Sequence, residues 1–433
     1  MASVTSRVEF RPIDLGLYLT WAIIAVLFLV MPLFFRSGFA ISLLSQMGIM
    51  IVFALSYNMI FGQGGMLSFG HAVYSGLGAF FAIHALNWIG DGRLALPVVL
   101  IPLVGGIFGA ICGVVFGYVT TKKAGVPFAM ITLGIGEMVH AAALMFPDFF
   151  GGEAGISADR VVGKPFLGFN LGPSIQVYYL IAVWCFLSMI AMYAFSQTPL
   201  GRISNAVRDN PERAEFIGYN TQRVRFFVLV ASSFFAGISG GLAAINFEII
   251  NAEQVSAIPS GAVLVATFIG GAMFFFGPVL GSIIFILFAI ALSEYTPAWQ
   301  FYLGIFFVLM VMYAPGGVTS ILLLNLRVAK EGLFKALRMP YLKLIAGSVV
   351  LLAGVVMLVE MAYGLTLSLG LGSMVRLFGI EFDAAAPMPW IIVTLLLLIG
   401  GWLFMRVRRQ FMLAWNEVNQ QIENRLQRAG GSR

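Results

Sequence analysis

Long apolar runs dominate this chain of 433 residues and restrict its fold more than any other feature. A hydrocarbon core about 30 Å thick needs roughly 20 apolar residues per helix, and runs of this kind recur along the whole sequence. Charged residues make up 10% of the chain, whereas soluble domains carry roughly 25%. We therefore predict an all-α polytopic membrane protein and exclude a soluble enzyme, a disordered chain and a secreted disulfide scaffold.

The apolar runs predict about ten to twelve transmembrane helices. Three runs between residues 264 and 314 are short, so this stretch forms either short spans or re-entrant hairpins. The runs lie at residues 15–35, 41–60, 67–86, 94–120, 126–146, 175–195, 226–249, 264–276, 279–292, 301–314, 344–363 and 389–405.

The distribution of basic residues predicts the orientation. With twelve crossings and an inside N-terminus, 20 of the 25 Lys and Arg residues fall in inner segments, as the positive-inside rule requires. We therefore expect both termini in the cytoplasm, and orientation explains the net charge of +6 without a nucleic-acid partner. The inner residues are Arg7, Arg11, Lys122, Lys123, Arg202, Arg208, Arg213, Arg223, Arg225, Arg327, Lys330, Lys335, Arg338, Lys343, Arg406, Arg408, Arg409, Arg425, Arg428 and Arg433.

A polar segment, residues 199–220, separates two apolar runs. Asn210 suits the N-cap of a helix, Pro211 its first position, Glu212 its positive end and Gly218 the residue just past its C-terminus. These signals predict a two-turn cytoplasmic helix at 211–217. Small and apolar residues surrounded by charges could form a face that docks in a groove of a partner, although a solvated loop fits the local pattern equally well. The residues of this face are Ala206, Ala214 and Ile217. The candidate coupling residues are Arg202, Arg208, Asn210, Pro211, Glu212, Arg213, Ala214, Glu215 and Gly218.

A glycine-rich stretch, residues 61–78, is the best candidate for a place where the membrane-embedded backbone leaves regular helix. Freed amide and carbonyl groups can meet a polar solute at such a break. We expect a half-helix that starts near Met66 and directs its positive end at a carboxylate. A tight helix crossing also explains glycines at this spacing, and it is the favoured interpretation for any single one of them. The candidate pathway residues are Gln63, Ser68, His71, Ser75, Thr132, Glu137 and His140.

Glu137 and His140 lie three residues apart in one apolar run, so they share a helix face. Ionisable side chains within a span usually face protein or water, and the pair therefore either belongs to a pathway or forms a structural hydrogen bond. Together with His71, the pair also supports an alternative function, an ion- or proton-coupled secondary transporter.

The sequence predicts neither a catalytic centre nor a nucleotide site. The inner segments reach at most about thirty residues, which is too short for an independent core, and the G-x-x-x-x-G-K-[ST] phosphate-binding motif does not occur in the sequence. Cys112 and Cys185 lie in apolar runs and are expected to be core side chains. We expect no enzyme activity, no metal and no cofactor on this chain, and any ATPase to be a separate chain.

Residues 199–220 resemble the coupling loop of bacterial ABC importer permeases, because they begin PLGR and continue through AVRDNP to GYN. This form is similar to the larger, LivM-like permease of the branched-chain amino acid importers. Three more stretches agree with that family in its order: FGQGGMLSFGHA at 61–72, PFAMITL at 127–133, and GG at 270–271 with GPVLG at 277–281. APGG at 314–317 occupies the closing position, where Arg-Pro-x-Gly is more usual. The similarity covers roughly residues 40–324.

The resemblance implies a type II-like importer bundle in the bacterial inner membrane. It also implies a second, smaller permease, two cytoplasmic ATPase subunits that bind ATP and Mg, and a periplasmic substrate-binding protein. ATP-driven closure of the ATPases would move the 211–217 helix and switch the bundle between inward and outward access. The cargo would be a branched-chain or other hydrophobic amino acid, or a related small organic solute.

The chain departs from the family beyond residue 324. We divide it into a permease core, 1–324, and a C-terminal extension, 325–433. The extension has two probable extra spans and a cytoplasmic tail in which Phe411, Trp415, Val418, Ile422 and Leu426 recur at helical spacing. This tail is predicted to be an amphipathic helix on the inner membrane surface.

Overall fold

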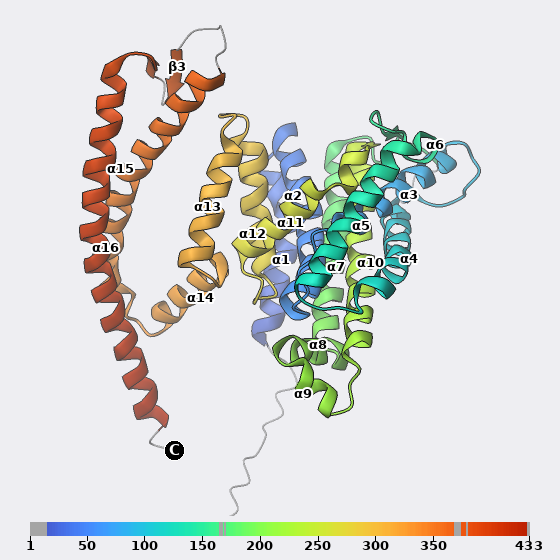
Figure 1. Ribbon diagram of the computed structural model, residues 1–433, viewed down its shortest axis with the longest axis horizontal. Coiled ribbons are helices and arrows are strands. Elements are labelled where there is room, and N and C mark those ends of the chain that lie inside the picture. The colour runs from blue at the N-terminus through green and yellow to red at the C-terminus, as the bar shows by residue number, and fades with distance from the viewer. Residues whose placement is uncertain (1–14, 164–167, 169, 368–373, 378–379, 431–433) are drawn as a thin grey trace, which may run out of the picture. The chain divides into compact units, whose positions relative to one another are not determined.

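The computed structural model describes residues 15–163, 168, 170–367, 374–377 and 380–430, and these are almost entirely helical (Figure 1). The all-α polytopic class is therefore confirmed. The chain forms two compact units, Met1–Ile286 and Leu287–Arg433. This division falls earlier than the boundary at 324 that the family resemblance gives. Arg7, Arg11 and Arg433 lie outside the described residues, as do the side chains of Arg425, Leu426 and Arg428.

The N-terminal unit is a bundle of helices with one two-stranded sheet. Its elements are α1 (Leu15–Phe34), α2 (Gly38–Asn58), the π-helix η1 (Met59–Gln63), α3 (Ala72–Gly90), η2 (Val98–Leu100), α4 (Ile101–Thr120), α5 (Val126–Met145), α6 (Pro147–Phe150), β1 (Ile156–Ser157), α7 (Ser174–Gln197), α8 (Pro199–Asp209), α9 (Pro211–Phe216), α10 (Thr221–Phe247), β2 (Ile249–Ile250), η3 (Ala252–Val255), α11 (Ala257–Gly270) and α12 (Gly277–Ile286).

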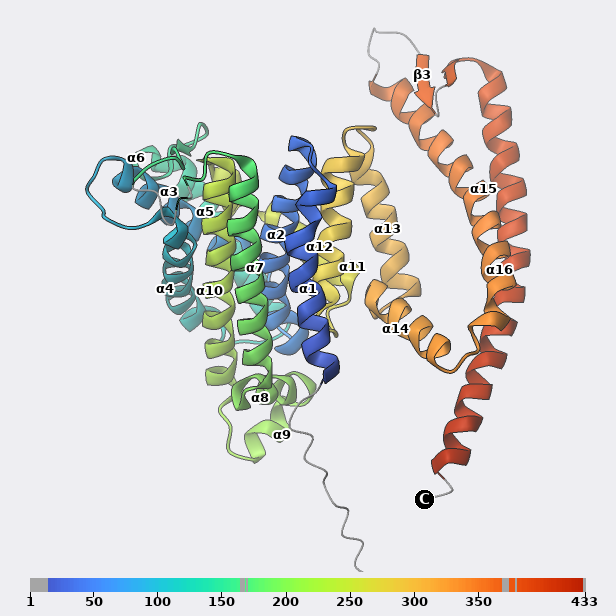
Figure 2. The same ribbon diagram turned by 180° about the vertical axis from the view of Figure 1, so that it is seen from behind.

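The C-terminal unit contains the π-helix η4 (Leu287–Leu292), α13 (Trp299–Tyr313), α14 (Gly317–Lys330), α15 (Phe334–Leu367), the antiparallel hairpin β3 (Met374–Leu377) and β4 (Ile380–Asp383), and α16 (Pro387–Gly430). The long helices α15 and α16 pack side by side in both views of the ribbon (Figures 1 and 2). Both extra spans expected at 344–363 and 389–405 are present within them.

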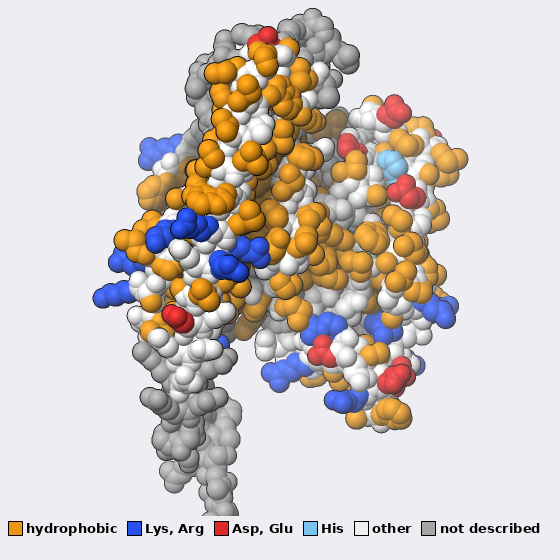
Figure 3. Space-filling view, turned by 60° about the vertical axis from the view of Figure 1, so that its left-hand side comes forward, with side chains coloured by type: hydrophobic (Ala, Val, Ile, Leu, Met, Phe, Trp, Pro, Cys, Tyr) orange, Lys and Arg blue, Asp and Glu red, His pale blue; other side chains and the backbone are white. Residues whose placement is uncertain are grey.

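Eight helices of the described chain are long and apolar enough to cross a membrane, or nine if α13 and α14, bent by 53°, count as one span. Three further apolar helices are shorter, at Tyr18–Phe34, Ala257–Gly270 and Gly277–Leu292. The long spans are thus fewer than the ten to twelve expected, because these segments form short helices. Large apolar side chains stand outward on many of the helices, and Figure 3 shows the broad apolar surface that results.

Glycines bring α4 and α10 into close contact in the core of the N-terminal unit. Gly105, Gly109 and Gly113 recur every fourth residue on α4 and face α10. A Cβ atom on Gly109 would lie 2.5 Å from the carbonyl oxygen of Ser233, and one on Gly113 would lie 2.7 Å from the Ser233 side chain. Small residues at this spacing let two helix backbones approach in a membrane. The contact places the buried helix α10 against α2, α3 and α4.

We expect Gly109→Leu to destabilise the protein by about 1–3 kcal/mol or more, since overpacking a close contact forces the backbones apart. The measurement is the thermal unfolding midpoint in detergent. Gly134→Leu is the matched control, because Gly134 on α5 has no neighbouring atom within 4 Å of an added Cβ. An equal loss of stability in the two variants would contradict a packing role for Gly109.

The loop between α5 and α7 is tied to the end of α10. Ile156 of β1 pairs with Ile250 of β2 in an antiparallel register. The Arg160 amide donates to Glu248 Oε1 at 3.0 Å, and the Arg160 guanidinium lies 3.5 Å from the same carboxylate and donates to Leu171 O. This loop is therefore anchored on the bundle by an ion pair and a short strand pairing.

The amphipathic tail differs from expectation. It continues the last span as one helix, α16, of 44 residues. Val418 and Ile422 are buried against Val328 and Leu337 of α14 and α15, with Trp415 packed beside them. The apolar stripe was expected to rest on the membrane surface, but it packs within the C-terminal unit because two other helices supply an apolar partner.

Candidate coupling and translocation site

Two short helices, α8 and α9, join α7 to α10 at one end of the N-terminal unit (Figure 1). Thr198 caps α8 by accepting from the amide of Gly201, and Pro199 follows it in the first turn. Asn210 caps α9 by accepting from the amide of Arg213 at 2.9 Å. The chain leaves α9 at Gly218, whose φ of 92° favours glycine. The predicted helix at 211–217 is thus confirmed to within one residue, whereas α8 was not predicted.

The tip of α9 carries exposed apolar side chains. Phe216 is 90% exposed and Ile217 is 64% exposed, with Tyr219 beside them. Arg202, Glu212 and Arg213 are also exposed on these two helices. Phe216 and Tyr219 are not among the predicted coupling residues, although an aromatic residue in an otherwise charged segment is a signal that points to them.

Two of the predicted coupling residues on α9, Ala214 and Glu215, face the bundle or join α9 to it. Ala214 is buried, so the expectation that it helps form the outward apolar face is wrong. The Glu215 carboxylate accepts a hydrogen bond from Thr221 Oγ1 at 2.7 Å and ties α9 to the first residue of α10. Ile217, which was also predicted to belong to this face, is exposed, and Phe216 and Tyr219 are exposed beside it.

Helix α8 contacts the point where α2 loses its regular structure. Arg208 donates from Nη1 to the carbonyl oxygen of Gly62 in η1, and the Ser204 hydroxyl lies 3.4 Å from the carbonyl of Gln63. Asp209 holds the Arg208 guanidinium from the other side at 2.8 Å. Gly65 faces the aliphatic part of the Arg208 side chain, and a Cβ atom added at Gly65 would lie 2.6 Å from Arg208 Cγ. The polar segment is therefore joined directly to the glycine-rich stretch.

Residues 64–71 are not helical, so the predicted backbone break is confirmed. The half-helix expected near Met66 begins instead at Ala72, whose amide is capped by the Ser260 hydroxyl of α11 at 3.0 Å. Backbone groups of the residues before Ala72 form hydrogen bonds with side chains of neighbouring segments instead of with the backbone of a helix. The Phe69 amide donates to Thr132 Oγ1, and Tyr57 Oη donates to Ser68 O.

Gly70 lets the backbone of the break pack closely against α5. A Cβ on Gly70 would overlap the carbonyl oxygen of Thr132 in α5. Close backbone packing, the favoured interpretation of these glycines, thus accounts for Gly70. Of the candidate pathway residues, Gln63, Ser68 and His71 lie in or beside the break, and Thr132 contacts it through the Phe69 amide.

His71 lies at the centre of this group and is fully buried. Its Nε2 is 3.0 Å from Ser56 Oγ, and its ring stacks on Phe53. Four buried polar atoms near the break have no hydrogen-bond partner among the described residues: Asn58 Oδ1, Gln63 Oε1, Ser68 Oγ and His71 Nδ1. A buried polar atom without a hydrogen-bond partner costs free energy. These four atoms would gain partners if the backbone around the break changed conformation or if a polar ligand bound there.

Ser75 lines a separate cavity of about 160 Å³. Its polar wall is formed by Gln46, Ser75, Ser239 and Gln254, and its apolar wall includes Phe53 and Phe247. No ionisable side chain lines it. The cavity therefore has one polar and one apolar wall.

Glu137 and His140 do not join these groups. Glu137 is exposed on α5, and His140 Nδ1 lies 3.0 Å from the carbonyl oxygen of Ala252 in η3. The two side chains form no hydrogen bond or ion pair with each other in the described structure. His140 thus has the structural contact that the sequence analysis left open, and His71 lies apart from both.

Among the described residues, no three His, Cys, Asp or Glu side chains are arranged to hold a metal ion. Cys112 and Cys185 are both free thiols, and Cys185 is fully buried in the core as expected.

Comparison with known proteins identifies the family. Residues 39–314 match the family described as branched-chain amino acid transport system / permease component. The chain is 25% identical over 295 residues to the high-affinity branched-chain amino acid transport system permease protein LivM of Escherichia coli, covering 62% of this chain and 67% of the relative. It is also 25% identical over 223 residues to the fructose import permease protein FrcC of Rhizobium meliloti, covering 49% of this chain and 61% of that relative. No solved structure matches.

The match begins just after α1 and ends just after α13, so it contains the coupling segment, the break at 64–71 and the cavity beside Ser75. The chain therefore belongs to the family of branched-chain amino acid ABC importer permeases and is LivM-like.

Proposed function

We propose that this chain is the transmembrane subunit of an inner-membrane importer in which separate ATPase subunits drive alternating access. The observation that carries the proposal is the continuous path from an exposed apolar tip, Phe216 and Ile217, through α8 to the intramembrane break. A partner that binds the tip can move α8 and, with it, Arg208. Because Arg208 donates to the carbonyl of Gly62, this movement would reach the break. Alternating access requires two conformations of the bundle, and such a partner would shift the equilibrium between them.

The complete assembly would contain a second, smaller permease, two cytoplasmic ATPase subunits that bind ATP and Mg, and a periplasmic binding protein. The orientation that suits it has α8, α9 and both termini in the cytoplasm. The basic residues support this orientation, because Arg202, Arg208 and Arg213 lie on α8 and α9. This chain would bind no nucleotide and perform no covalent chemistry.

The cargo would be a branched-chain or other hydrophobic amino acid, or a related small organic solute. The relatives include a branched-chain amino acid permease and a fructose permease. The cavity beside Ser75 favours the former, since eight of its twelve lining residues are apolar. An aliphatic side chain fits its Phe53 and Phe247 wall.

Substitution of Glu137 separates this function from a proton-coupled carrier. We expect Glu137→Gln to leave uptake of radiolabelled leucine or valine within about twofold of wild type, because the carboxylate is exposed and forms no hydrogen bond or ion pair with the described residues of the break. Uptake would be measured in cells that contain the complete transporter, with and without a protonophore. A tenfold loss in the variant, together with protonophore sensitivity at constant ATP, would overturn the importer proposal in favour of proton coupling.

A further inference from the structure

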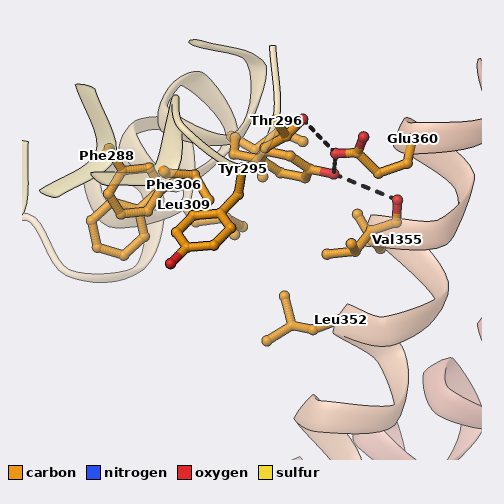
Figure 4. Close-up of a pocket in the computed structure, with 12 residues that line it drawn as sticks. Phe288, Tyr295, Thr296, Phe306, Leu309, Leu352, Val355 and Glu360 are labelled. Atoms are coloured by element: carbon orange, nitrogen blue, oxygen red, sulfur yellow. Dashed lines mark hydrogen bonds between the residues drawn. The ribbon is translucent and has the colours of Figure 1, made fainter. Parts of the chain in front are cut away.

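The C-terminal unit contains a cavity of about 700 Å³ between α13 and α15 (Figure 4). This volume is within the roughly 300–1,000 Å³ typical of small-molecule sites. Most of its wall is apolar, and Figure 4 shows these side chains around a central space. They include Phe288, Phe306, Leu309, Leu352 and Val355.

One carboxylate, that of Glu360 on α15, stands at the edge of this apolar cavity. Its Oε1 accepts from Thr296 Oγ1 at 2.7 Å and from Tyr302 Oη at 2.8 Å (Figure 4). The Thr296 hydroxyl also accepts from the Ala298 amide, so its own proton is directed at Glu360. Two donors thus fix one carboxylate oxygen, and the other oxygen has no hydrogen-bond partner among the described residues.

Among the described residues, none that lines the cavity is a counter-ion for this carboxylate. No Lys, Arg or His lines it, and no described basic side chain forms an ion pair with Glu360. Lys343, the nearest basic residue before it on α15, lies seventeen residues earlier in the sequence, or about 25 Å along a helix. An acidic side chain within a span normally pairs with a partner, and a cationic ligand would supply the positive charge that the described side chains around Glu360 do not.

The membrane itself can provide such a ligand. Leu309 and Leu352 are exposed as well as lining the cavity, so the cavity opens onto the apolar surface of α13 and α15. An acyl chain fits the apolar wall, and an ammonium group fits the carboxylate. The free oxygen needs an N–H donor, which a primary ammonium has and a quaternary choline headgroup lacks.

We propose that this cavity binds a phospholipid with a primary ammonium headgroup, such as phosphatidylethanolamine. The acyl chain occupies the space among Phe288, Phe306 and Leu352, and the ammonium donates to Glu360. The site is formed by α13 and by α15 of the C-terminal extension, and it is independent of the proposed coupling function.

Lipid exchange into the full-length protein tests this proposal. Protein purified in detergent is mixed with phosphatidylethanolamine and phosphatidylcholine of identical acyl chains, and bound lipid is counted by native mass spectrometry. We expect wild type to retain at least about threefold more phosphatidylethanolamine, and stepwise N-methylation of the headgroup to reduce that preference. Equal retention of the two lipids by wild type would overturn the proposal.

Two variants separate the headgroup contact from a structural role. Glu360→Gln keeps a carbonyl oxygen for Thr296 and Tyr302 but removes the charge, and we expect the preference to fall to about one. Glu294→Gln is the matched control, because Glu294 is exposed and does not line the cavity. Should Glu360→Gln fold poorly, Leu309→Trp, which fills the apolar space, is expected to lower retention of both lipids severalfold. Unchanged preference in a folded Glu360→Gln variant, or unchanged retention in Leu309→Trp, counts against the site.

Discussion

Replacing Phe216 by alanine is expected to weaken assembly of the ATPase subunit with this chain by about ten- to a hundredfold and to reduce uptake in proportion. The side chain is 90% exposed at the tip of α9, and burying a phenylalanine in a partner is worth about 1.5–3 kcal/mol. Each 1.4 kcal/mol is about a tenfold change in affinity. The measurements are the amount of ATPase that copurifies with the tagged chain and the initial rate of uptake.

Phe227→Ala is the matched control for this result. Phe227 is also exposed, at 54%, but it lies on the apolar helix α10 rather than at the tip. We expect its substitution to leave the ATPase stoichiometry unchanged. If Phe216→Ala also assembled at the wild-type level, the tip of α9 would not be the docking surface.

Arg208→Ala is expected to give a different defect, in which ATP hydrolysis continues while uptake falls at least tenfold. Arg208 does not belong to the exposed tip but donates to the Gly62 carbonyl at the intramembrane break. A hydrogen bond from a charged group is worth about 1.5–3 kcal/mol, and its loss would disconnect movement of α8 from η1. The measurement is the ratio of solute transported to ATP hydrolysed in reconstituted vesicles.

Arg202→Ala serves as the control, because it removes the same charge from an exposed position on α8. We expect its transport ratio to stay close to wild type. A parallel fall of hydrolysis and uptake in Arg208→Ala would show that this residue acts in docking rather than in transmission.

The sequence predicted best where short-range chemistry decides the structure. The cap at Asn210, the proline after it and the glycine at 218 are all local signals, and they located α9 to within one residue. The apolar runs likewise located most of the long spans. The backbone break was predicted because glycines and polar residues concentrate in one short stretch.

Contacts between distant segments could not be predicted in the same way. The start of α3 depends on Ser260, which lies 188 residues later and caps Ala72. The burial of Ala214 and the contact of Arg208 with Gly62 likewise depend on how α8 and α9 fold back onto the bundle. The periodicity correctly predicted an apolar stripe on the tail. It could not predict that the stripe packs against the end of α14 and the start of α15, because these helices are distant in the sequence.

The unbroken length of α16 has a mechanical consequence. Its 44 residues extend for about 66 Å as a helix, roughly twice the thickness of a hydrocarbon core. A helix of this length can place one end in water while the other end remains among lipid tails. Because the described helix is continuous, a tilt of the half among lipid tails also moves the other half, together with the ends of α14 and α15 that Val418 and Ile422 contact. A spectroscopic probe at that end would register the movement at a distance from the transported solute.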